Sequence, residues 1–204
     1  DGFSLALAED YADLLDETGR DYLMRIRRAT AKAESYMQAL LQVSRQTRGE
    51  LNLRPINLSE EIFDLNNQVA LRHTGRIVPL SIQADVKVQA DLQLIRTLLL
   101  ALLDNGWKFT ADKDCPQLSF GQTKTEHGPA IYLKDNGVGF DMAFASDRLF
   151  RMFQRFHGTK IEGMGTGLAT ALRIVNRHGG SIWATAEPDQ GATFFFTLPQ
   201  SQVG

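Results

Sequence analysis

The sequence predicts an α+β protein in which a two-layer α/β sandwich follows an α-helical hairpin. Three observations lead to this class. Apolar residues recur at heptad spacing within residues 1–50, capped apolar helices are expected after residue 56, and short strand-like segments flanked by turn residues fill most of the remainder. Helices and mostly antiparallel strands are therefore segregated along the chain, as is typical of α+β proteins.

Length and composition limit the possibilities. The 204 residues suffice for one compact domain and a smaller appendage, which we assign to residues 51–204 and 1–50. Hydrophobic residues (43%) and charged residues (23%) have ordinary globular proportions, which excludes a wholly disordered, collagen-like or disulfide-framework protein. The net charge is −2, and neither part of the chain is a basic arm, so we expect no nucleic-acid partner.

The cellular location is predicted from apolar runs and cysteine content. The longest apolar runs, such as Leu98–Leu103, are too short to cross a bilayer, and the N-terminal residues do not form a signal segment. We therefore expect no membrane contact and a cytoplasmic location. Cys115 is the single cysteine, which excludes an internal disulfide and fits a reducing compartment. Because the chain begins with Asp1 rather than Met, we expect it to be part of a longer protein.

Residues 1–50 are expected to form a helical hairpin. Asp16 is placed to cap the second helix, after a shorter apolar segment, Phe3–Leu14. A single hairpin would expose the apolar stripe of the second helix, so we expect a homodimeric four-helix bundle. The alternative is that the stripe packs against the rest of the chain. Its residues are spaced alternately by four and three positions: Tyr22, Ile26, Ala29, Ala33, Tyr36, Leu40 and Val43.

A change of composition marks the start of the second domain. We expect a linker between Gly49 and Pro55, after which Asn57 and Glu60 form a capping box that begins a helix towards Leu71. Further expected helices are 92–108, capped by Asp91, and 166–178, ended by Gly179 and Gly180. Expected strands are 77–84, 86–90, 118–125, 130–134, 181–186 and 192–198.

The first of three segments with chemical potential is Leu103–Thr110, at the end of an apolar helix. The amide oxygen of Asn105 can bind Mg²⁺, and Lys108, three positions later on the same helical face, can reach a phosphate. Taken alone, the segment is equally consistent with an ordinary polar helix terminus.

The second segment, Asp135–Phe140, directly follows an expected strand. Asp135 can accept a hydrogen bond from an exocyclic amine, and two glycines, Gly137 and Gly139, allow the backbone to approach a flat ligand. A tight turn at the end of a strand is the alternative interpretation.

The third segment, Gly163–Leu168, comes immediately before a helix. Its glycines Gly163, Gly165 and Gly167 expose backbone N–H groups at a helix N-terminus, where phosphate binds readily. A flexible loop is the alternative, because the spacing matches neither the P-loop nor the dinucleotide fingerprint.

Together and in this order, the three segments resemble the N, G1 and G2 boxes of histidine kinases, members of the GHKL ATPase superfamily that includes DNA gyrase. Leu149–His157 resembles the F box, and Gly191–Pro199 resembles the closing strand, so the resemblance covers residues 51–199. The hairpin resembles a truncated dimerisation and phosphotransfer domain, and residues 1–4 are similar to the residues directly after the H box of phytochrome-type sensor kinases.

The resemblance implies a protein-histidine kinase that binds ATP and Mg²⁺ within the GHKL fold. Asn105 would hold Mg²⁺, Lys108 would contact phosphate, and Arg155 would neutralise charge on the γ-phosphoryl group. The base would be bound by Phe109, Asp135, Gly137, Gly139 and Thr193, with Thr193 supporting the Asp135 contact. The phosphates would be wrapped by a lid that contains Gly163, Gly165, Gly167 and Leu168.

The implied function is that of the ATP-binding catalytic region of a bacterial two-component sensor kinase. It would transfer the γ-phosphoryl group to a histidine upstream of Gly2, and its partners would be a second copy and the receiver domain of a response regulator. The four histidines of this chain, His73, His127, His157 and His178, all lie outside the hairpin, and we expect them to be surface or turn residues.

Two departures from the family pattern support an alternative function. The family often has a second Asn four residues before the first, preceded by an acid, whereas this chain has Ala101 and Leu100. Met164 also replaces a frequent Ser or Thr between lid glycines, where the backbone does most of the binding. The alternative is a degenerate kinase that acts as a dimeric signalling scaffold and docks a response regulator. A GHKL hydrolase acting on nucleic acid is disfavoured by the lack of basic excess.

Overall fold

The computed structural model describes residues 2–11, 14–46, 50–73, 75–126, 128–145, 148–151 and 165–198. The chain divides into two compact units, Asp1–Arg48 and Gly49–Gly204. Within the described residues, we found no helix with the length and apolar character needed to cross a membrane.

The first unit contains two helices, α1 (Gly2–Asp10) and α2 (Glu17–Gln46). The Oδ1 atom of Asp16 accepts a hydrogen bond of 2.7 Å from the N–H of Gly19, so Asp16 caps α2 as the sequence predicts. Large apolar side chains of this unit are exposed, with Tyr22 at 59% and Ile26 at 52%. The predicted helical hairpin is therefore present, and its two helices do not bury these large apolar side chains against each other.

The second unit contains a mixture of helices and strands. Its helices are α3 (Leu58–Arg72), α4 (Leu92–Phe109), α5 (Met142–Ala145) and α6 (Gly167–Arg177). Its strands are β1 (Leu53–Asn57), β2 (Leu80–Ile82), β3 (Lys87–Asp91), β4 (Leu118–Thr125), β5 (Gly128–Asp135), β6 (Ile182–Glu187) and β7 (Gly191–Phe196).

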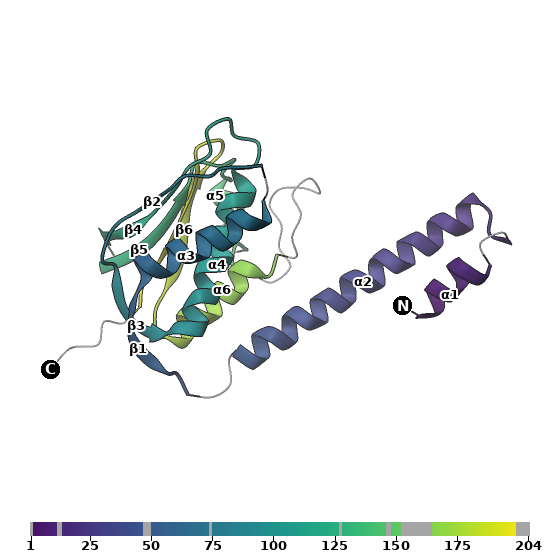
Figure 1. Ribbon diagram of the computed structural model, residues 1–204, viewed down its shortest axis with the longest axis horizontal. Helices are drawn as coiled ribbons and strands as arrows, with labels where there is room; N and C mark the ends of the chain where they lie inside the picture. The colour runs from purple at the N-terminus through teal and green to yellow at the C-terminus, as the bar shows by residue number, and fades with distance from the viewer. Residues whose placement is uncertain are drawn as a thin grey trace. The chain divides into compact units, whose positions relative to one another are not determined.

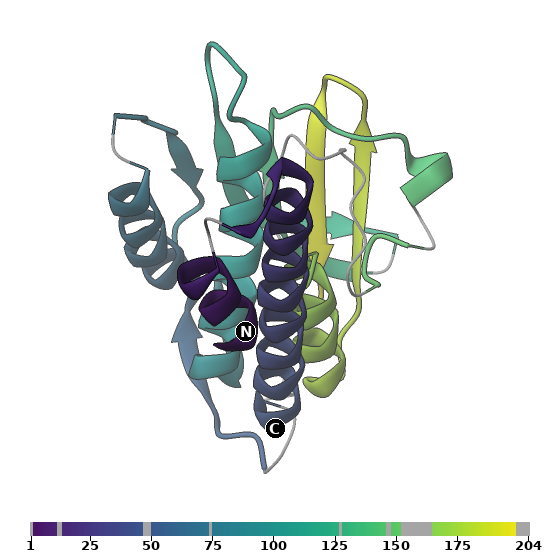
Figure 2. The ribbon, with the colours of Figure 1, turned by 90° about the vertical axis from the view of Figure 1, so that its right-hand side faces the viewer.

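Five of these strands form the main sheet, in the order β2-β4-β5-β7-β6. All neighbours are antiparallel except β2 and β4, which are parallel, while β1 and β3 form a separate antiparallel pair. Helices α3, α4 and α6 cover one face of the sheet, as Figures 1 and 2 show. The apolar core lies between these helices and the sheet, and the arrangement is the predicted two-layer α+β sandwich.

Capping residues fix where the two longest helices of this unit begin. Asn57 Oδ1 accepts from the N–H of Ser59, and Asn57 Nδ2 donates to Glu60, so the predicted capping pair is present at α3. Asp91 Oδ1 accepts from the N–H groups of Gln93 and Leu94 and caps α4. Both caps were identifiable because each involves residues two or three positions apart.

Two expectations about the fold were wrong, and one short helix was missed. Residues 53–57 form strand β1 rather than a linker, with Pro55 opposite Gln89 in a two-stranded pair where a proline can be accommodated. The strand expected over 77–84 pairs only from Leu80 to Ile82, and Ile77 is 83% exposed. The short helix α5 was not expected, since four residues carry too little periodicity to be detected.

His178 is neither a surface nor a simple turn residue. Its side chain is buried, its Nδ1 atom lies 2.8 Å from the carbonyl oxygen of Ile174, and its Nε2 atom accepts from the N–H of Asp91 at 3.1 Å. With Nδ1 protonated, one neutral imidazole satisfies both partners. His178 therefore joins the end of α6 to the residue that caps α4.

Candidate functional site

The end of α4 carries the first predicted segment. Asn105 and Lys108 share a helical face, and Gly106 between them allows α4 to lie directly on the sheet. A Cβ atom at Gly106 would lie 2.7 Å from Cδ2 of Leu118 in β4, so a side chain at this position would have to displace the end of the Leu118 side chain. The absence of a side chain at Gly106 therefore places Asn105 and Lys108 close to the main sheet.

Asn105 has an unsatisfied polar atom. Its Nδ2 atom is buried and has no hydrogen-bond partner among the residues that the structure describes. A buried donor without a partner costs roughly 1–3 kcal/mol, so such groups usually bind something. This observation fits a site at which a polar ligand contacts the Asn105 amide.

The neighbouring residues are a carboxylate and a cation. Burial raises the pKa of Asp104, and the charges of Arg72 and His73 partly oppose this rise. The Nζ atom of Lys108 lies 5.2 Å from the ring centroid of Phe109. The Lys108 cation and the Phe109 ring, which were assigned to phosphate and base, are thus adjacent at the end of α4.

Asp135 ends β5 with a buried carboxylate. Its Oδ1 atom accepts from the N–H of Gly137 at 2.8 Å and from the N–H of Ala192 at 3.3 Å. Burial raises the pKa of this carboxyl, and the two backbone hydrogen bonds partly offset the rise. Both bonds go to Oδ1, so Oδ2 remains as an acceptor for a ligand donor such as an exocyclic amine.

Glycines make the turn after β5 fit its surroundings. A Cβ atom at Gly137 would lie 2.5 Å from the carbonyl oxygen of Phe109, and one at Gly139 would lie 1.9 Å from that of Glu187. Gly139 also has a φ of +58°, which favours glycine. Gly191, at the start of β7, has a φ of +91°, and its Cβ would lie 2.1 Å from the carbonyl oxygen of Asp135. The three glycines let backbone segments meet around Asp135.

Thr193 does not support Asp135. It pairs with Lys134 across β5 and β7, and directly opposite residues share a face of the sheet. Lys134 is exposed and Asp135 is buried, so Thr193 projects from the face opposite to that of Asp135. The supporting contact comes instead from the backbone N–H of Ala192. Sequence reasoning missed it because a backbone donor carries no residue-type signal.

The third predicted segment is described only in part. Gly165 has a φ of +68°, Gly167 begins α6, and Leu168 packs partly buried against the core. The Thr166 side chain makes no capping hydrogen bond, so it leaves the first N–H groups of α6 to other acceptors. A Cβ atom at Gly167 would lie 3.6 Å from Cβ of Ala101, which places the start of α6 beside α4.

Two predicted residues lie outside the described part of the chain. They are Arg155, assigned to the γ-phosphoryl group, and Gly163, the first lid glycine. The described residues nevertheless bring together Asn105, Lys108 and Phe109 from α4 with Asp135, Gly137 and Gly139 from the turn after β5. Gly191 and Ala192, at the start of the segment that resembles the closing strand, join them, although only Thr193 of that segment had been assigned to the site.

The metal-binding capacity of the site is small. The described residues contain no cluster of three His, Cys, Asp or Glu side chains that could hold a metal ion. Mg²⁺ keeps several waters and is usually bound through one or two protein oxygens and substrate phosphates, so it does not require such a cluster. Asn105 could supply such an oxygen.

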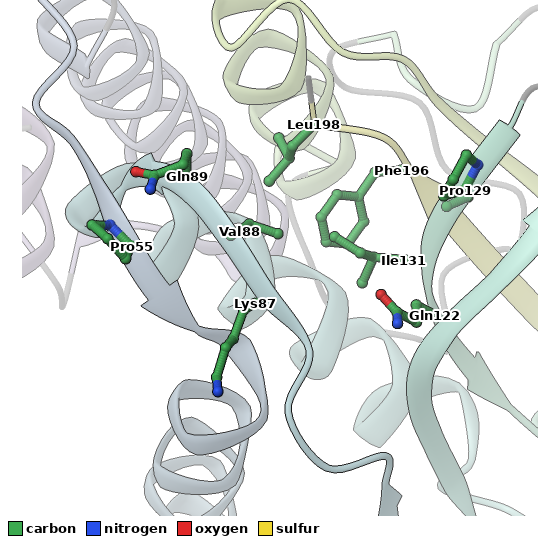
Figure 3. A pocket seen from close by; sticks show the side chains of 10 residues that line it. Pro55, Lys87, Val88, Gln89, Gln122, Pro129, Ile131, Phe196 and Leu198 are labelled. Carbon is green, nitrogen blue, oxygen red and sulfur yellow. The ribbon is translucent and has the colours of Figure 1, made fainter. Parts of the chain in front are cut away.

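A cavity of about 280 Å³ lies elsewhere in the second unit. In Figure 3 the side chains of Val88, Ile131, Phe196 and Leu198 gather around it. Its lining includes residues from the start of β5, whereas Asp135 ends that strand, and none of the predicted site residues contributes. The cavity is therefore separate from the candidate site.

Comparison with known proteins was made on the sequence and the fold. The family model described as histidine kinase-, DNA gyrase B-, and HSP90-like ATPase matches residues 90–202. Cyanobacterial phytochrome B of Nostoc sp. (strain PCC 7120) is 30% identical over 204 residues, and the match covers 96% of this chain and 26% of that protein. The methanogenesis regulatory histidine kinase FilI of Methanothrix harundinacea is 29% identical over 200 residues, which cover 97% of this chain and 22% of that protein.

A solved structure shares the fold. The crystal structure of full-length ShkA in complex with AMPPNP superposes with a TM-score of 0.65 at 23% identity, over 91% of this chain and 39% of that one. The chain thus spans about a quarter of the length of the two curated relatives, with which it shares both units.

Proposed function

The chain belongs to the family of histidine kinase-, DNA gyrase B- and HSP90-like ATPases, and from this premise we propose that it is the ATP-binding catalytic region of a two-component sensor histidine kinase. The γ-phosphoryl group of ATP would be transferred to a histidine outside this chain, upstream of Gly2. The sequence resemblance to GHKL histidine kinases is thereby confirmed at the level of the family.

The observation that carries the proposal is the Asp135 carboxylate. One oxygen is held by two backbone N–H groups, and the other is left without a partner among the described residues. An acceptor fixed in this way can distinguish an adenine amine from the carbonyl oxygen that guanine carries at the same ring position. Glycines at 137, 139 and 191 bring backbone close to this carboxylate on several sides.

The remaining residues would bind and orient the triphosphate. Lys108 and the N-terminal N–H groups of α6 would contact phosphate oxygens, and Asn105 would hold a magnesium ion through its amide oxygen. Mg²⁺, when bound, would neutralise charge on the phosphates. Arg155 would contribute a second positive charge. These positioning and electrostatic tasks are what phosphoryl transfer mainly requires.

The first unit would provide the dimer and the docking surface for a receiver domain. Its large apolar side chains are exposed in the single chain, among them Tyr22, Ile26 and Met37. Exposed large apolar side chains on one helix favour association with a second copy. We propose a homodimer through this unit and a response regulator receiver domain as the second partner.

One observation favours a degenerate scaffold as the second candidate function. Ala101 occupies the position at which the family often has another Asn, and it lies beside Gly167 at the start of α6. The methyl group of Ala101 lies next to the start of α6 and cannot serve as a metal ligand. Such a chain would bind nucleotide weakly or independently of Mg²⁺ and would signal through docking alone.

Nucleotide titration tests the proposal. Isothermal calorimetry with ATP, with and without Mg²⁺, should show binding that Mg²⁺ strengthens, and GTP should bind far more weakly. The control is Asp189→Asn, an exposed carboxylate in the β6–β7 turn, which should bind ATP normally. Absence of ATP binding would contradict the proposal. Binding that Mg²⁺ does not strengthen would favour the scaffold.

A further inference from the structure

The last turn of α4 has a complete set of hydrogen-bond partners for its carbonyl groups. A helix leaves its last four carbonyls without partners from within the helix. Here the carbonyl oxygen of Gly106 accepts from Thr110, and that of Lys108 accepts from the N–H of Ala111. The carbonyl oxygen of Phe109 accepts from the N–H of Val138, in the turn after Asp135.

The carbonyl oxygen of Trp107 is bound by a side chain from a distant segment. Arg76, in the loop between α3 and β2, donates from Nη1 to this oxygen and from Nη2 to Thr110 Oγ1 at 2.8 Å. The Thr110 hydroxyl lies 2.7 Å from the carbonyl oxygen of Gly106. One guanidinium group therefore binds two groups at the helix end, the Trp107 carbonyl and the Thr110 hydroxyl, and its positive charge lies where the helix dipole is negative.

The Trp107 ring is fixed as well as its backbone. Its Nε1–H donates to Asn66 Oδ1 at 2.9 Å, and the His73 ring stacks on it with centroids 5.3 Å apart. The Arg76 guanidinium lies 5.8 Å from the ring centroid of Trp107. The ring is almost fully buried, so the helix end cannot turn without breaking these contacts.

This anchored turn carries the residues assigned to phosphate and metal. Asn105 precedes Trp107 by two positions, Lys108 follows it directly, and both project from the same turn of helix. We propose that Arg76 is a positioning residue, which fixes the last turn of α4 so that Asn105 and Lys108 face the phosphates of a bound nucleotide. This inference rests on the proposed function and extends it to a residue outside the three motifs.

The arrangement requires the shape of arginine. Its planar fork presents two N–H donors to the Trp107 carbonyl and the Thr110 hydroxyl at the same time. A lysine would place a single ammonium group and would reach one of the two acceptors. Arg76→Lys should therefore recover part of the function that Arg76→Met removes.

Calorimetry on the whole chain tests the role of Arg76. The measured quantity is the ratio of the ATP dissociation constants without and with Mg²⁺, together with the affinity for adenosine. Loss of a residue that orients a metal ligand typically lowers metal affinity by about 10–100-fold, so Arg76→Met should reduce the ratio by about 10-fold or more. Adenosine affinity should fall less than this ratio does, because Asp135 is held by β5 and β7 and, of the residues assigned to the base, only Phe109 lies on this turn.

The controls separate positioning from general stability. Arg54→Met removes an exposed arginine from β1 and should leave the ratio unchanged. Hydrogen exchange of the ligand-free chain should show faster exchange at residues 105–111 in Arg76→Met than in wild type. Intermediate values for Arg76→Lys would support the fork argument.

Three results would overturn the inference. The first is that wild type binds ATP and Arg76→Met has the same ratio of ATP dissociation constants without and with Mg²⁺ as wild type. This result would overturn the inference even if Arg76→Met melts at a lower temperature. Unchanged hydrogen exchange at the end of α4 would show that Arg76 does not hold this turn. If wild type itself binds no ATP, the proposed function fails and the positioning role fails with it.

Discussion

The carbonyl oxygen of Phe109 accepts a hydrogen bond of 3.0 Å from the N–H of Val138. This bond joins the end of α4, which carries Asn105 and Lys108, to the turn after Asp135. Gly137, which directly precedes Val138, lies very close to the same oxygen. A Cβ atom at Gly137 would come within 2.5 Å of it. The spacing between the base-binding and phosphate-binding segments therefore depends on one backbone contact and one missing side chain.

Replacing Gly137 with Ala should separate these two segments. The new methyl group would overlap a backbone oxygen that cannot rotate away, so the turn must move, at a cost of about 1–3 kcal/mol of unfolding free energy. ATP affinity should fall by about 10-fold or more, because Asp135 and Asn105 would no longer be correctly spaced. Urea unfolding and calorimetry give the two values.

The matched control is Gly128→Ala. Gly128 has a positive φ, +93°, which Gly137 lacks, and a Cβ there meets nothing within 4 Å, so this variant introduces backbone strain without the overlap. The variant should lose about 1–2 kcal/mol from backbone strain alone and should bind ATP normally. If Gly137→Ala binds ATP as well as Gly128→Ala does, the close contact is irrelevant to the site.

Asp135→Asn should weaken ATP binding without unfolding the protein. An amide oxygen can keep the two bonds from Gly137 and Ala192, while the amide nitrogen at the other position donates and so repels an adenine amine. Loss of a hydrogen bond to a charged group is worth about 1.5–3 kcal/mol, or roughly 10- to 150-fold in affinity. Calorimetry that shows unchanged ADP affinity would refute the assignment of Asp135.

The same variant should change how stability depends on pH. Burial raises the pKa of Asp135, so the folded protein favours the protonated carboxyl. This contribution to stability is fully present below the unfolded pKa of about 3.9 and is lost as pH rises through the higher folded pKa. Asp135→Asn lacks this loss, so its unfolding free energy relative to that of wild type should rise as the pH increases above about 4.

Urea unfolding of the ligand-free protein at several pH values measures this difference. Asp189→Asn, in which the carboxylate is exposed, serves as the control and should follow wild type. An unfolding free energy of Asp135→Asn that falls relative to that of wild type as pH rises would have the wrong sign for a desolvated carboxyl.

Local signals were well predicted from the sequence, and long-range contacts were not. The caps Asn57 and Asp91 were identified because each binds residues two or three positions away. The Ala192 N–H that binds Asp135 was missed, and Thr193 was assigned in its place, because register between distant strands decides which residue faces the site. The bond from His178 to Asp91 spans 87 positions. No pattern within one segment can indicate such a bond.

The candidate site shows the same division. Asn105, Lys108 and Asp135 stand in short motifs whose order along the chain is informative. Arg76 stands in no motif, and its role emerges only when the fold brings its loop to the end of α4. The role of Arg76 follows from its hydrogen bond to Trp107, which lies 31 positions away along the chain, and no local sequence pattern indicates that bond.

The first unit should make the chain a dimer at micromolar concentration. Ile26→Glu together with Leu40→Glu would place charges on the apolar stripe and should give monomers, because burying an unpaired charge costs more than the contact contributes. Arg28→Glu introduces the same residue next to the stripe and should leave the dimer intact. Light scattering distinguishes these states, and a monomeric wild-type chain at high micromolar concentration would contradict the bundle.

The last prediction concerns phosphoryl transfer. This chain alone should bind Mg²⁺-ATP and yet form no phosphohistidine, because its four histidines all lie outside the first unit and one of them, His178, is buried and bonded on both ring nitrogens. A longer chain that includes the residues upstream of Gly2 should become labelled from ATP carrying a labelled γ-phosphate. Asn105→Asp in that chain should abolish labelling, since the change alters the charge and donor capacity of the metal ligand.

If the longer chain binds ATP tightly but stays unlabelled, while Leu100→Glu with Ala101→Asn allows labelling, the natural protein is a scaffold. Labelling of the present chain itself would contradict the assignment of its histidines.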